Sequence, residues 1–329
     1  MAVLVTGVAG FIGFHVAQAL LDRGEEVIGV DIVNAYYDPS LKEARLRQIE
    51  GRDGYRFVRA DIAELEQIRA IAKENAERIT GVVHLAAQAG VRHSLTAPFD
   101  YVRSNLVGHM VMLEVARHDL PNLKSFAYAS SSSVYGGNDK IPFSVDDQVD
   151  RPVSLYAATK RADELMSYAY SHLYGLPQTG LRFFTVYGPW GRPDMAAYIF
   201  ADAIAKERPI TLFNHGDMKR DFTYIDDIVA GVLAALDRPP EPDAQGVRAR
   251  VYNLGNNQPN DLRTFVRILE REMGRDAVVK LAPMQPGDVP ATFADIEASR
   301  QDLGFQPVTP LEEGLPKFVA WYKRYHGVN

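Results

Sequence analysis

The sequence predicts an α/β chain in which a parallel sheet is covered by helices on both faces, with a smaller α/β lobe built mainly from the second half. Apolar, strand-like runs alternate with amphipathic, helix-like stretches through the first half of the chain. This alternation is typical of parallel βαβ units in a doubly wound sheet. The apolar runs cover residues 3–5, 27–30, 56–59, 81–85, 125–129 and 179–183, and helical stretches between them include 62–75, 101–118 and 157–174.

The first apolar run leads into three glycines, Gly7, Gly10 and Gly13, spaced G-x-x-G-x-x-G, and then into an amphipathic stretch over residues 14–23. We expect a helix to begin at the last glycine. Backbone N–H groups at such a turn can approach a pyrophosphate closely. The next run ends on Asp31, whose carboxylate can accept hydrogen bonds from both hydroxyls of an adenosine ribose and would repel a 2′-phosphate. These features predict a Rossmann unit that prefers NAD to NADP.

The second half of the chain has a different rhythm. A loop rich in proline and glycine covers residues 188–193, and the expected helices cover 196–206, 225–235 and 262–273. Too few strands are predicted here for a second doubly wound sheet. We therefore divide the chain into a Rossmann domain over 1–185, with returning segments near 224–255, and a substrate-binding lobe made mainly of 186–329.

Composition limits the classes of ligand. The net charge of −6 leaves no broad basic surface for nucleic acid or anionic lipid. The absence of cysteine excludes disulfides and thiolate chemistry, and the eight histidines show no metal-ligand spacing. No apolar run approaches membrane-spanning length, and the chain opens on a strand pattern instead of a signal sequence. We expect a cytoplasmic protein that binds a small molecule, without a metal, nucleic acid or membrane partner.

A proton relay is predicted after the fifth apolar run. Consecutive serines follow that run, and Tyr156 and Lys160 stand one helical turn apart, so both project from one helix face. A buried ammonium beside a phenol stabilises the phenolate, which lets Tyr156 act as a general base toward a hydroxyl. One of Ser131, Ser132 and Ser133 would share the moving proton, and the sequence leaves open which one contacts the reacting hydroxyl.

Together these features resemble the extended short-chain dehydrogenase/reductase superfamily, in its NAD-dependent nucleotide-sugar epimerase and dehydratase branch. The resemblance covers essentially the whole chain. The residues that carry it are 6–13, Asp31, Asp61, Ile62, 84–87, Asn105, Ser131, Tyr156, Lys160, 220–227 and 286–289. It implies NAD as the cofactor, a UDP-sugar as the substrate and a homodimer formed through a four-helix bundle.

The resemblance also implies the binding residues. Those toward the cofactor are Gly7, Gly10, Phe11, Ile12, Gly13, Asp31, Asp61, Ile62, Leu85, Ala86, Ala87, Tyr156 and Lys160. Those toward the substrate are Arg92, Ser132, Ser133, Thr185, Arg192, Phe213, Arg220 and Asp288. Within these sets, Asp61 and Ile62 would lie against the adenine, Phe213 on the uracil, Arg220 at the diphosphate and Asp288 at a ribose hydroxyl. Many members have a basic residue where this chain has Gln285.

The residues after the catalytic serine indicate the expected reaction. Dehydratases of this branch resemble one another in carrying Asp-Glu just before a Val-Tyr-Gly motif, and UDP-xylose synthases carry Glu there. In this chain Ser132 and Ser133 precede that motif, so no carboxylic acid is available there to expel water. The resemblance therefore favours oxidation at C4, rotation of the 4-keto sugar and return of the hydride to its other face, which is a 4-epimerisation.

Ser132, Ser133, Thr185 and Arg192, together with residues 33–40 and 88–92, closely resemble the corresponding positions of UDP-glucuronate 4-epimerases, which interconvert UDP-glucuronate and UDP-galacturonate. We hypothesise that the hydroxyls hold the sugar carboxylate, because oxidation at C4 creates a β-keto acid that loses CO₂ when this group rotates. Arg192 is expected near the carboxylate or the diphosphate. A UDP-galactose or UDP-N-acetylhexosamine 4-epimerase, a UDP-glucuronate decarboxylase and a non-catalytic NAD-binding regulator remain as alternatives.

Overall fold

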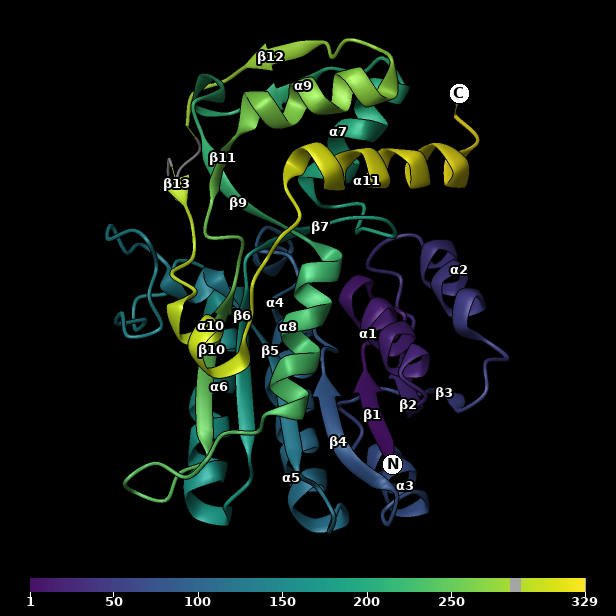
Figure 1. Cartoon of the computed structure of the whole chain (residues 1–329), viewed down its shortest axis with the longest axis vertical. Coiled ribbons are helices and arrows are strands. Elements are labelled where there is room, and N and C mark those ends of the chain that lie inside the picture. The colour runs from purple at the N-terminus through teal and green to yellow at the C-terminus, as the bar shows by residue number, and fades with distance from the viewer. Residues whose placement is uncertain (285–290, 329) are drawn as a thin grey trace.

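The computed structural model describes residues 1–284 and 291–328. Its main body is a seven-stranded sheet in which every neighbouring pair of strands is parallel (Figure 1). In spatial order the strands are β10 (Ala249–Leu254), β6 (Gln178–Phe183), β5 (Ser125–Ser131), β4 (Ile79–His84), β1 (Ala2–Thr6), β2 (Glu26–Asp31) and β3 (Tyr55–Arg59). The strand order reverses between β1 and β4, where open α/β sheets bind ligands at the carboxyl ends of their strands.

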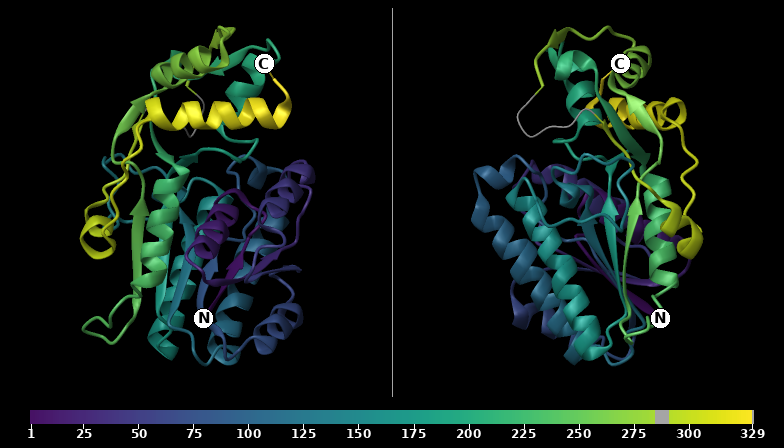
Figure 2. Two further views of the ribbon diagram at one scale, coloured as in Figure 1. Left: turned by 45° about the vertical axis from the view of Figure 1, so that its right-hand side comes forward. Right: turned by 90° about the vertical axis from the view of Figure 1, so that its left-hand side faces the viewer.

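Helices cover both faces of this sheet, which confirms the predicted fold class (Figure 2). One face carries α1 (Phe11–Asp22), α8 (Ile225–Asp237) and, beside α1, α2 (Pro39–Ile49). The other carries α3 (Leu65–Glu74), α5 (Gly108–Asp119) and α6 (Leu155–Tyr174). Strand β1 shows why two layers are needed: Val3 and Val5 belong to one buried cluster and Leu4 to the other, since successive side chains point to opposite faces.

Helix α1 begins at Phe11, so the expected start at Gly13 is wrong by two residues. Gly7 turns the chain with φ +75°, and Gly10 then caps the helix in an extended conformation. Gly13 lies within the first helical turn because that turn packs on the glycine loop: a Cβ on Gly13 would lie 2.1 Å from the carbonyl oxygen of Gly7.

The single helix expected over residues 101–118 is divided in the structure. It consists of α4 (Pro98–Tyr101), a π-helical turn η2 (Val102–Val107) and α5. A π turn inserts an extra residue into the helical repeat, and such turns are frequent at functional sites. The sequence pattern has the period of the α-helix on either side and gives no sign of this insertion.

The second lobe lies over the carboxyl ends of the main sheet (Figure 1). Its sheets contain β7 (Thr185–Tyr187), β9 (Lys219–Tyr224), β11 (Pro259–Asp261) and β13 (Ala291–Thr292), and separately β8 (Ile210–Leu212) and β12 (Val279–Leu281). Helices α7 (Ala196–Ala205), α9 (Leu262–Met273) and α11 (Leu311–His326) pack around them. The short elements are η1 (His93–Leu95), η3 (Ser132–Tyr135), η4 (Asn214–Gly216) and α10 (Glu297–Leu303). Of these, η1 and η3 follow strands of the main sheet, and α10 packs on α8 and β10, which come from the second half of the chain but belong to the main body.

Candidate active site

A cleft of about 1260 Å³ is lined by strand ends of the main body and by segments of the second lobe. Every sequence-predicted site residue within the described ranges lines this cleft. Asp288 and Gln285 lie outside the described residues. The structure therefore gathers into one cavity residues that are spread along the chain from Gly7 to Arg220.

The glycine-rich loop forms the floor of the cleft at the end of β1. A Cβ on Gly7 would lie 2.7 Å from the backbone nitrogen of Ala86, and one on Gly10 would lie 2.9 Å from the carbonyl oxygen of Gly7. These close approaches leave no space for a side chain at either position. The glycines therefore allow the loop to pack tightly, and all three line the cleft at the start of α1, where a helix N-terminus can bind a pyrophosphate.

Asp31 ends β2 beside this loop. Its Oδ2 accepts a hydrogen bond from the backbone N–H of Ala9 at 3.0 Å, and its Oδ1 accepts one from that of Val33 at 2.7 Å. Burial raises the pKa of Asp31, and these two N–H groups and the charge of Lys42 oppose that rise. The carboxylate is thus held between the glycine loop and the β2–α2 segment, at the lining of the cleft.

Asp61 and Ile62 follow β3 on the same side of the cleft. The Oδ1 of Asp61 accepts from the backbone N–H of Ala63 at 2.9 Å, and its Oδ2 pairs with Arg103 at 2.8 Å. Arg103 comes from η2, so the ion pair ties the π-helical turn to the loop after β3. Both Asp61 and Arg103 line the cleft.

The π-helical turn places Asn105 under the segment that follows β4. Its Oδ1 accepts from the backbone N–H of Gln88 at 2.8 Å, and its Nδ2 donates to the Gln88 carbonyl at 3.1 Å and to Thr159 Oγ1 at 2.9 Å. Thr159 belongs to α6, the helix that carries Tyr156 and Lys160. Asn105 therefore fixes the chain after Leu85–Ala87 relative to the catalytic helix.

The predicted relay lies where β5 ends and α6 begins. Ser131 and Ser133 hold each other, with Oγ atoms 3.1 Å apart and the backbone N–H of Ser133 donating to Ser131 Oγ at 3.2 Å. Tyr156 lines the cleft, and its ring meets that of Tyr101 edge-on at 6.0 Å. Lys160 is 4% exposed, and its Nζ donates to the carbonyl oxygen of Ala129 on β5 at 3.0 Å. The ammonium is thus anchored to the strand that ends in the serines.

The substrate side of the cleft comes from the second lobe. Thr185 begins β7, and Arg192 lies in the loop before α7. The Arg192 Nε donates to Asp194 Oδ1 at 2.9 Å, and Tyr36 donates to the other carboxylate oxygen at 2.9 Å. Tyr36 comes from the β2–α2 segment, so Asp194 joins the two sides of the cleft while it orients Arg192. The neighbouring guanidinium and these hydrogen bonds hold the pKa of Asp194 below its ordinary value against the effect of burial.

Phe213 and Arg220 lie farther along the same side. Phe213 precedes η4 and packs against the hydrophobic core, and Arg220 lies on β9, where one of its nitrogens donates to the carbonyl oxygen of Lys219 at 2.9 Å. Arg92 lines the cleft just before η1, in the main body. An aromatic ring and cations around one cavity form an arrangement that suits a nucleoside diphosphate.

Tyr36, Lys42 and Asp194 also line the cleft, although the sequence interpretation gave these residues no individual role. The Lys42 ammonium is buried and donates to the backbone and side-chain oxygens of Asn34 at 2.9 and 2.6 Å. A lysine on an amphipathic helix such as α2 normally points to solvent. Only the tertiary contact with the β2–α2 segment turns it inward, so a single sequence carries no signal for it.

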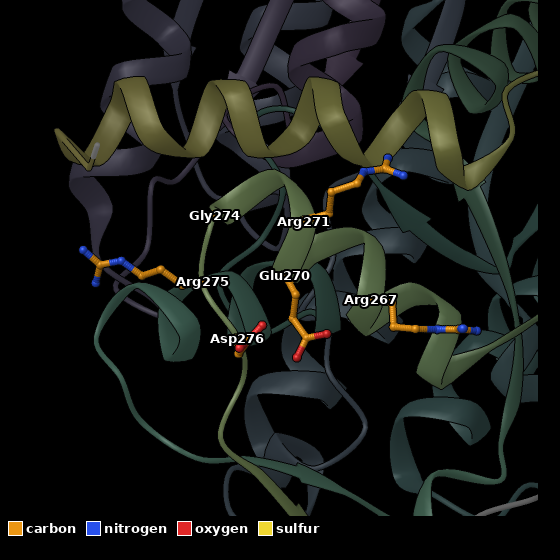
Figure 3. A pocket seen from close by; sticks show the side chains of 6 residues that line it. All are labelled: Arg267, Glu270, Arg271, Gly274, Arg275 and Asp276. Atoms are coloured by element: carbon orange, nitrogen blue, oxygen red, sulfur yellow. The ribbon is translucent and has the colours of Figure 1, made fainter.

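A smaller pocket of about 540 Å³ lies outside this cleft, at the C-terminal end of α9. Figure 3 shows that the side chains of Arg267, Arg271 and Arg275 point in different directions. Glu270 is already engaged there, because its carboxylate accepts from the backbone N–H of Ala277 at 2.9 Å. The charged groups do not converge on a common point, so this pocket offers no organised ligand site.

Within residues 1–284 and 291–328, no group of three or more His, Asp or Glu side chains is arranged to hold a metal ion. No helix of the same part of the chain combines the length and the apolar character needed to cross a bilayer.

A doubly wound sheet, a glycine-rich loop after β1 and a Tyr156–Lys160 pair beside the serine strand define a dinucleotide-dependent enzyme of the short-chain dehydrogenase/reductase class. Residues 3–255 match the NAD dependent epimerase/dehydratase family, and the chain belongs to that family.

Individual relatives extend the match to nearly the full chain. UDP-glucuronate 4-epimerase 4 of Arabidopsis thaliana is 50% identical over 336 residues, covering 99% of this chain and 76% of its own length. A probable UDP-glucuronate 4-epimerase of Rhizobium meliloti is 46% identical over 337 residues, covering 98% of this chain and 97% of its own. The crystal structure of UDP-glucuronic acid 4-epimerase from Bacillus cereus, in complex with UDP-glucuronic acid and NAD, superposes with a TM-score of 0.87 at 33% identity, covering 99% of this chain and 100% of that one.

Proposed function

We propose that this protein is an NAD-dependent UDP-glucuronate 4-epimerase that interconverts UDP-glucuronate and UDP-galacturonate while suppressing decarboxylation. The observation that carries this proposal is the shared cleft: the glycine loop, the Tyr156–Lys160 pair and the hydroxyls of the serine strand and Thr185 all line it. The names of the relatives at 46–50% identity support the same activity.

The residues present fit NAD. The glycine loop has no space for a Cβ and offers backbone N–H groups at the start of α1, where a pyrophosphate is stabilised. Asp31 presents a carboxylate where an adenosine ribose would lie, and Ile62 and Leu85–Ala87 supply apolar surface beside it. Bound NAD would supply the hydride acceptor and donor for C4, so the net reaction needs no other oxidant.

Tyr156 acts in this proposal as the general base that takes the proton of the C4 hydroxyl and later returns it. Lys160 stabilises the phenolate electrostatically. Its hydrogen bond to the Ala129 carbonyl holds the ammonium against β5. Ser131 lies at the end of that strand and shares the proton with Tyr156. Because the same groups serve oxidation and reduction, the protein needs no additional acid or base between the two steps.

Ser132, Ser133, Thr185 and Arg192 hold the sugar carboxylate in this proposal. Oxidation at C4 gives a β-keto acid, which loses CO₂ when the carboxylate bond aligns with the carbonyl π system. A hydrogen bond to a charged group contributes about 1.5–3 kcal/mol, so two or three hydroxyls can keep the carboxylate out of that alignment. Asp194 and Tyr36 orient the Arg192 guanidinium toward the cleft.

The remaining assignments are parts of the same proposal. Phe213 packs on the uracil, Arg220 and Arg92 meet the anionic groups, and Asp288 binds a ribose hydroxyl. Residues 1–185 with the segments near 224–255 bind the cofactor, and 186–329 mainly bind the UDP-sugar. The cytoplasmic location stays a prediction.

We also propose a homodimer through the α5–α6 face. These helices lie side by side on one outer face of the sheet (Figure 2). Apolar side chains are exposed there or on the adjoining α4–η2 segment: Leu165 is 55%, Tyr168 51% and Phe99 83% exposed. Apolar patches of this kind mark interaction surfaces, and a second copy of the chain would pair the two helices into a four-helix bundle.

The test is to incubate the purified protein with UDP-glucuronate and, separately, with UDP-glucose, with and without added NAD, and to resolve the nucleotide sugars by chromatography. We expect UDP-galacturonate to form without net NADH. UDP-pentose with CO₂ as the main product would indicate a decarboxylase, and turnover of UDP-glucose alone would indicate a UDP-galactose 4-epimerase. NAD binding without turnover of either sugar would indicate a regulator.

A further inference from the structure

A buried carboxylate stands beside the lysine of the predicted relay. Asp163 follows Lys160 by three residues on α6, and its Oδ2 accepts from Lys160 Nζ at 2.9 Å. Asp163 is 1% exposed. Its other oxygen, Oδ1, is buried and has no hydrogen-bond partner among the described residues. Among the described residues, the Asp163 carboxylate therefore binds only Lys160 of the same helix and connects α6 to no other element.

The other titratable groups around this pair come from α6 itself and from β4, β5, β6 and α5. Glu164 of the same helix is charge-paired with Arg182 of β6 at 2.8 Å and with Arg161 at 2.9 Å. His84 of β4 and His109 of α5 are buried, and burial lowers the pKa of His84 to about 3 and that of His109 well below its ordinary value. Burial also raises the pKa of Tyr128 of β5.

At neutral pH the histidines and Tyr128 are thus uncharged, and Glu164 is held between the guanidinium groups of Arg182 and Arg161. The Lys160 ammonium and the Asp163 carboxylate form a separate ion pair behind Tyr156, while the Arg192 guanidinium acts on Tyr156 from the loop before α7. Because the two charges of the ion pair have opposite signs, the relay has a nearly neutral pair behind it instead of a full positive charge.

Burial of an ionised carboxylate is costly unless it is fully hydrogen-bonded. Burial raises the pKa of Asp163 to about 6, although the neighbouring Lys160 opposes the rise. The Ala129 carbonyl already anchors Lys160. Because one oxygen of the Asp163 carboxylate has no hydrogen-bond partner among the described residues, this group contributes little to holding the structure together. Its main physical effect on the site is its charge.

We propose that Asp163 is a positioning residue that partly neutralises Lys160, so that Tyr156 loses its proton less readily than it would beside an unpaired lysine. This inference rests on the proposed role of Tyr156 as general base. Two helical turns separate Tyr156 from Asp163, about 10 Å along the axis. At that separation a unit charge shifts a protonation midpoint by about one pH unit.

The experiment compares the wild-type holoenzyme with Asp163→Asn, which keeps an oxygen that can accept from Lys160 but removes the negative charge. The tyrosinate absorbance near 295 nm is followed against pH without sugar. From each curve we subtract the curve of the protein that has the same residue at position 163 and also carries Tyr156→Phe. Many other tyrosines titrate late in this fold; burial raises the pKa of Tyr101 and of Tyr170 to about 12. We expect the Tyr156 midpoint to fall by about one pH unit in Asp163→Asn.

The acid limb of the pH profile of kcat/KM for UDP-glucuronate should move in the same direction, because the phenolate is then available at lower pH. Asp163→Glu restores the charge and should restore the midpoint. Asp119→Asn is the matched control: it removes a buried carboxylate at the far end of α5, paired there with Arg69 at 3.1 Å, and should leave the midpoint unchanged.

A midpoint that stays in place or rises in Asp163→Asn, with the protein folded and NAD retained, overturns the role of Asp163. So does an equal shift in Asp119→Asn. The absorbance titration needs no substrate turnover. A wild-type protein that fails to epimerise UDP-glucuronate would contradict the proposed function, while the titration would still decide whether Asp163 controls Tyr156.

Discussion

The two sides of the cleft are built in different ways. On the cofactor side the decisive groups are backbone atoms of one short loop and a carboxylate at the end of the neighbouring strand, Asp31. On the substrate side they are the side chains of Ser133, Thr185 and Arg192, which belong to η3, to β7 and to the loop before α7. The first arrangement is fixed by local chain geometry, whereas the second depends on how distant segments pack.

This difference predicts how each side responds to substitution. Backbone atoms cannot rotate away as side chains can, so an atom added to the glycine loop displaces the whole loop. A set of separate side chains can lose one member and still hold its ligand through the others. Changes on the cofactor side should therefore reduce binding steeply, and changes on the substrate side should alter which product forms.

The relay at the junction of the two sides should show the largest effect. Tyr156→Phe removes the hydroxyl that, in the proposed mechanism, exchanges the proton with the C4 hydroxyl, and general acid–base catalysis contributes about 10²–10⁴-fold. We expect kcat for UDP-glucuronate to fall by about 10³-fold while the protein retains NAD, measured as bound nucleotide per chain. Turnover at the wild-type rate with NAD still bound would remove Tyr156 from the catalytic assignment.

On the cofactor side, Gly13→Ala should show the next largest effect. The added Cβ would lie 2.1 Å from the carbonyl oxygen of Gly7, which is backbone and cannot rotate away. Overpacking of this kind costs about 1–3 kcal/mol, which corresponds to about fivefold to 140-fold in affinity. The measurement is the Kd for NAD by calorimetry on protein stripped of nucleotide.

Gly137→Ala is the matched control, because the same methyl group there would meet only Val153 Cγ1, at 3.8 Å. We expect its NAD affinity to equal that of the wild type. If Gly13→Ala binds NAD as tightly as Gly137→Ala, the glycine loop is more adaptable than its geometry indicates, and the contrast between the two sides of the cleft fails.

The same contrast explains what the sequence could predict. The glycine spacing and Asp31 are local signals, and Leu262–Met273 was predicted with its observed bounds. The start of α1 was misplaced because Gly10, and not Gly13, takes the capping conformation. On both sides of the π-helical turn at Val102–Val107 the apolar pattern has the period of the α-helix, so periodicity gives no indication of the extra residue.

The substrate side required the family resemblance. Thr185 and Arg192 lie in segments whose local sequence pattern predicts only a strand and a loop. Both line the cleft because β7 pairs with β9 in parallel and because the loop before α7 returns to the cleft. The Tyr36–Asp194 hydrogen bond joins residues 158 positions apart. Asp163 lies only three residues after Lys160 in the sequence, but a single sequence does not show that its side chain is buried and not solvated.

Thr185→Val should show the smallest effect and tests the substrate side directly. Valine has nearly the shape of threonine but lacks the hydroxyl, so the hydrogen bond that we propose between Thr185 and the sugar carboxylate is lost while Ser132 and Ser133 remain. We expect the ratio of UDP-pentose to UDP-galacturonate to rise by about tenfold, which corresponds to about 1.4 kcal/mol, near the lower end for one hydrogen bond to a charged group. Thr211→Val, which removes a hydroxyl from the same cleft beside Phe213, should leave the ratio unchanged. Equal ratios in all three proteins would mean that Thr185 does not restrain the carboxylate, and that the substrate side holds it through Arg192 and the serines alone.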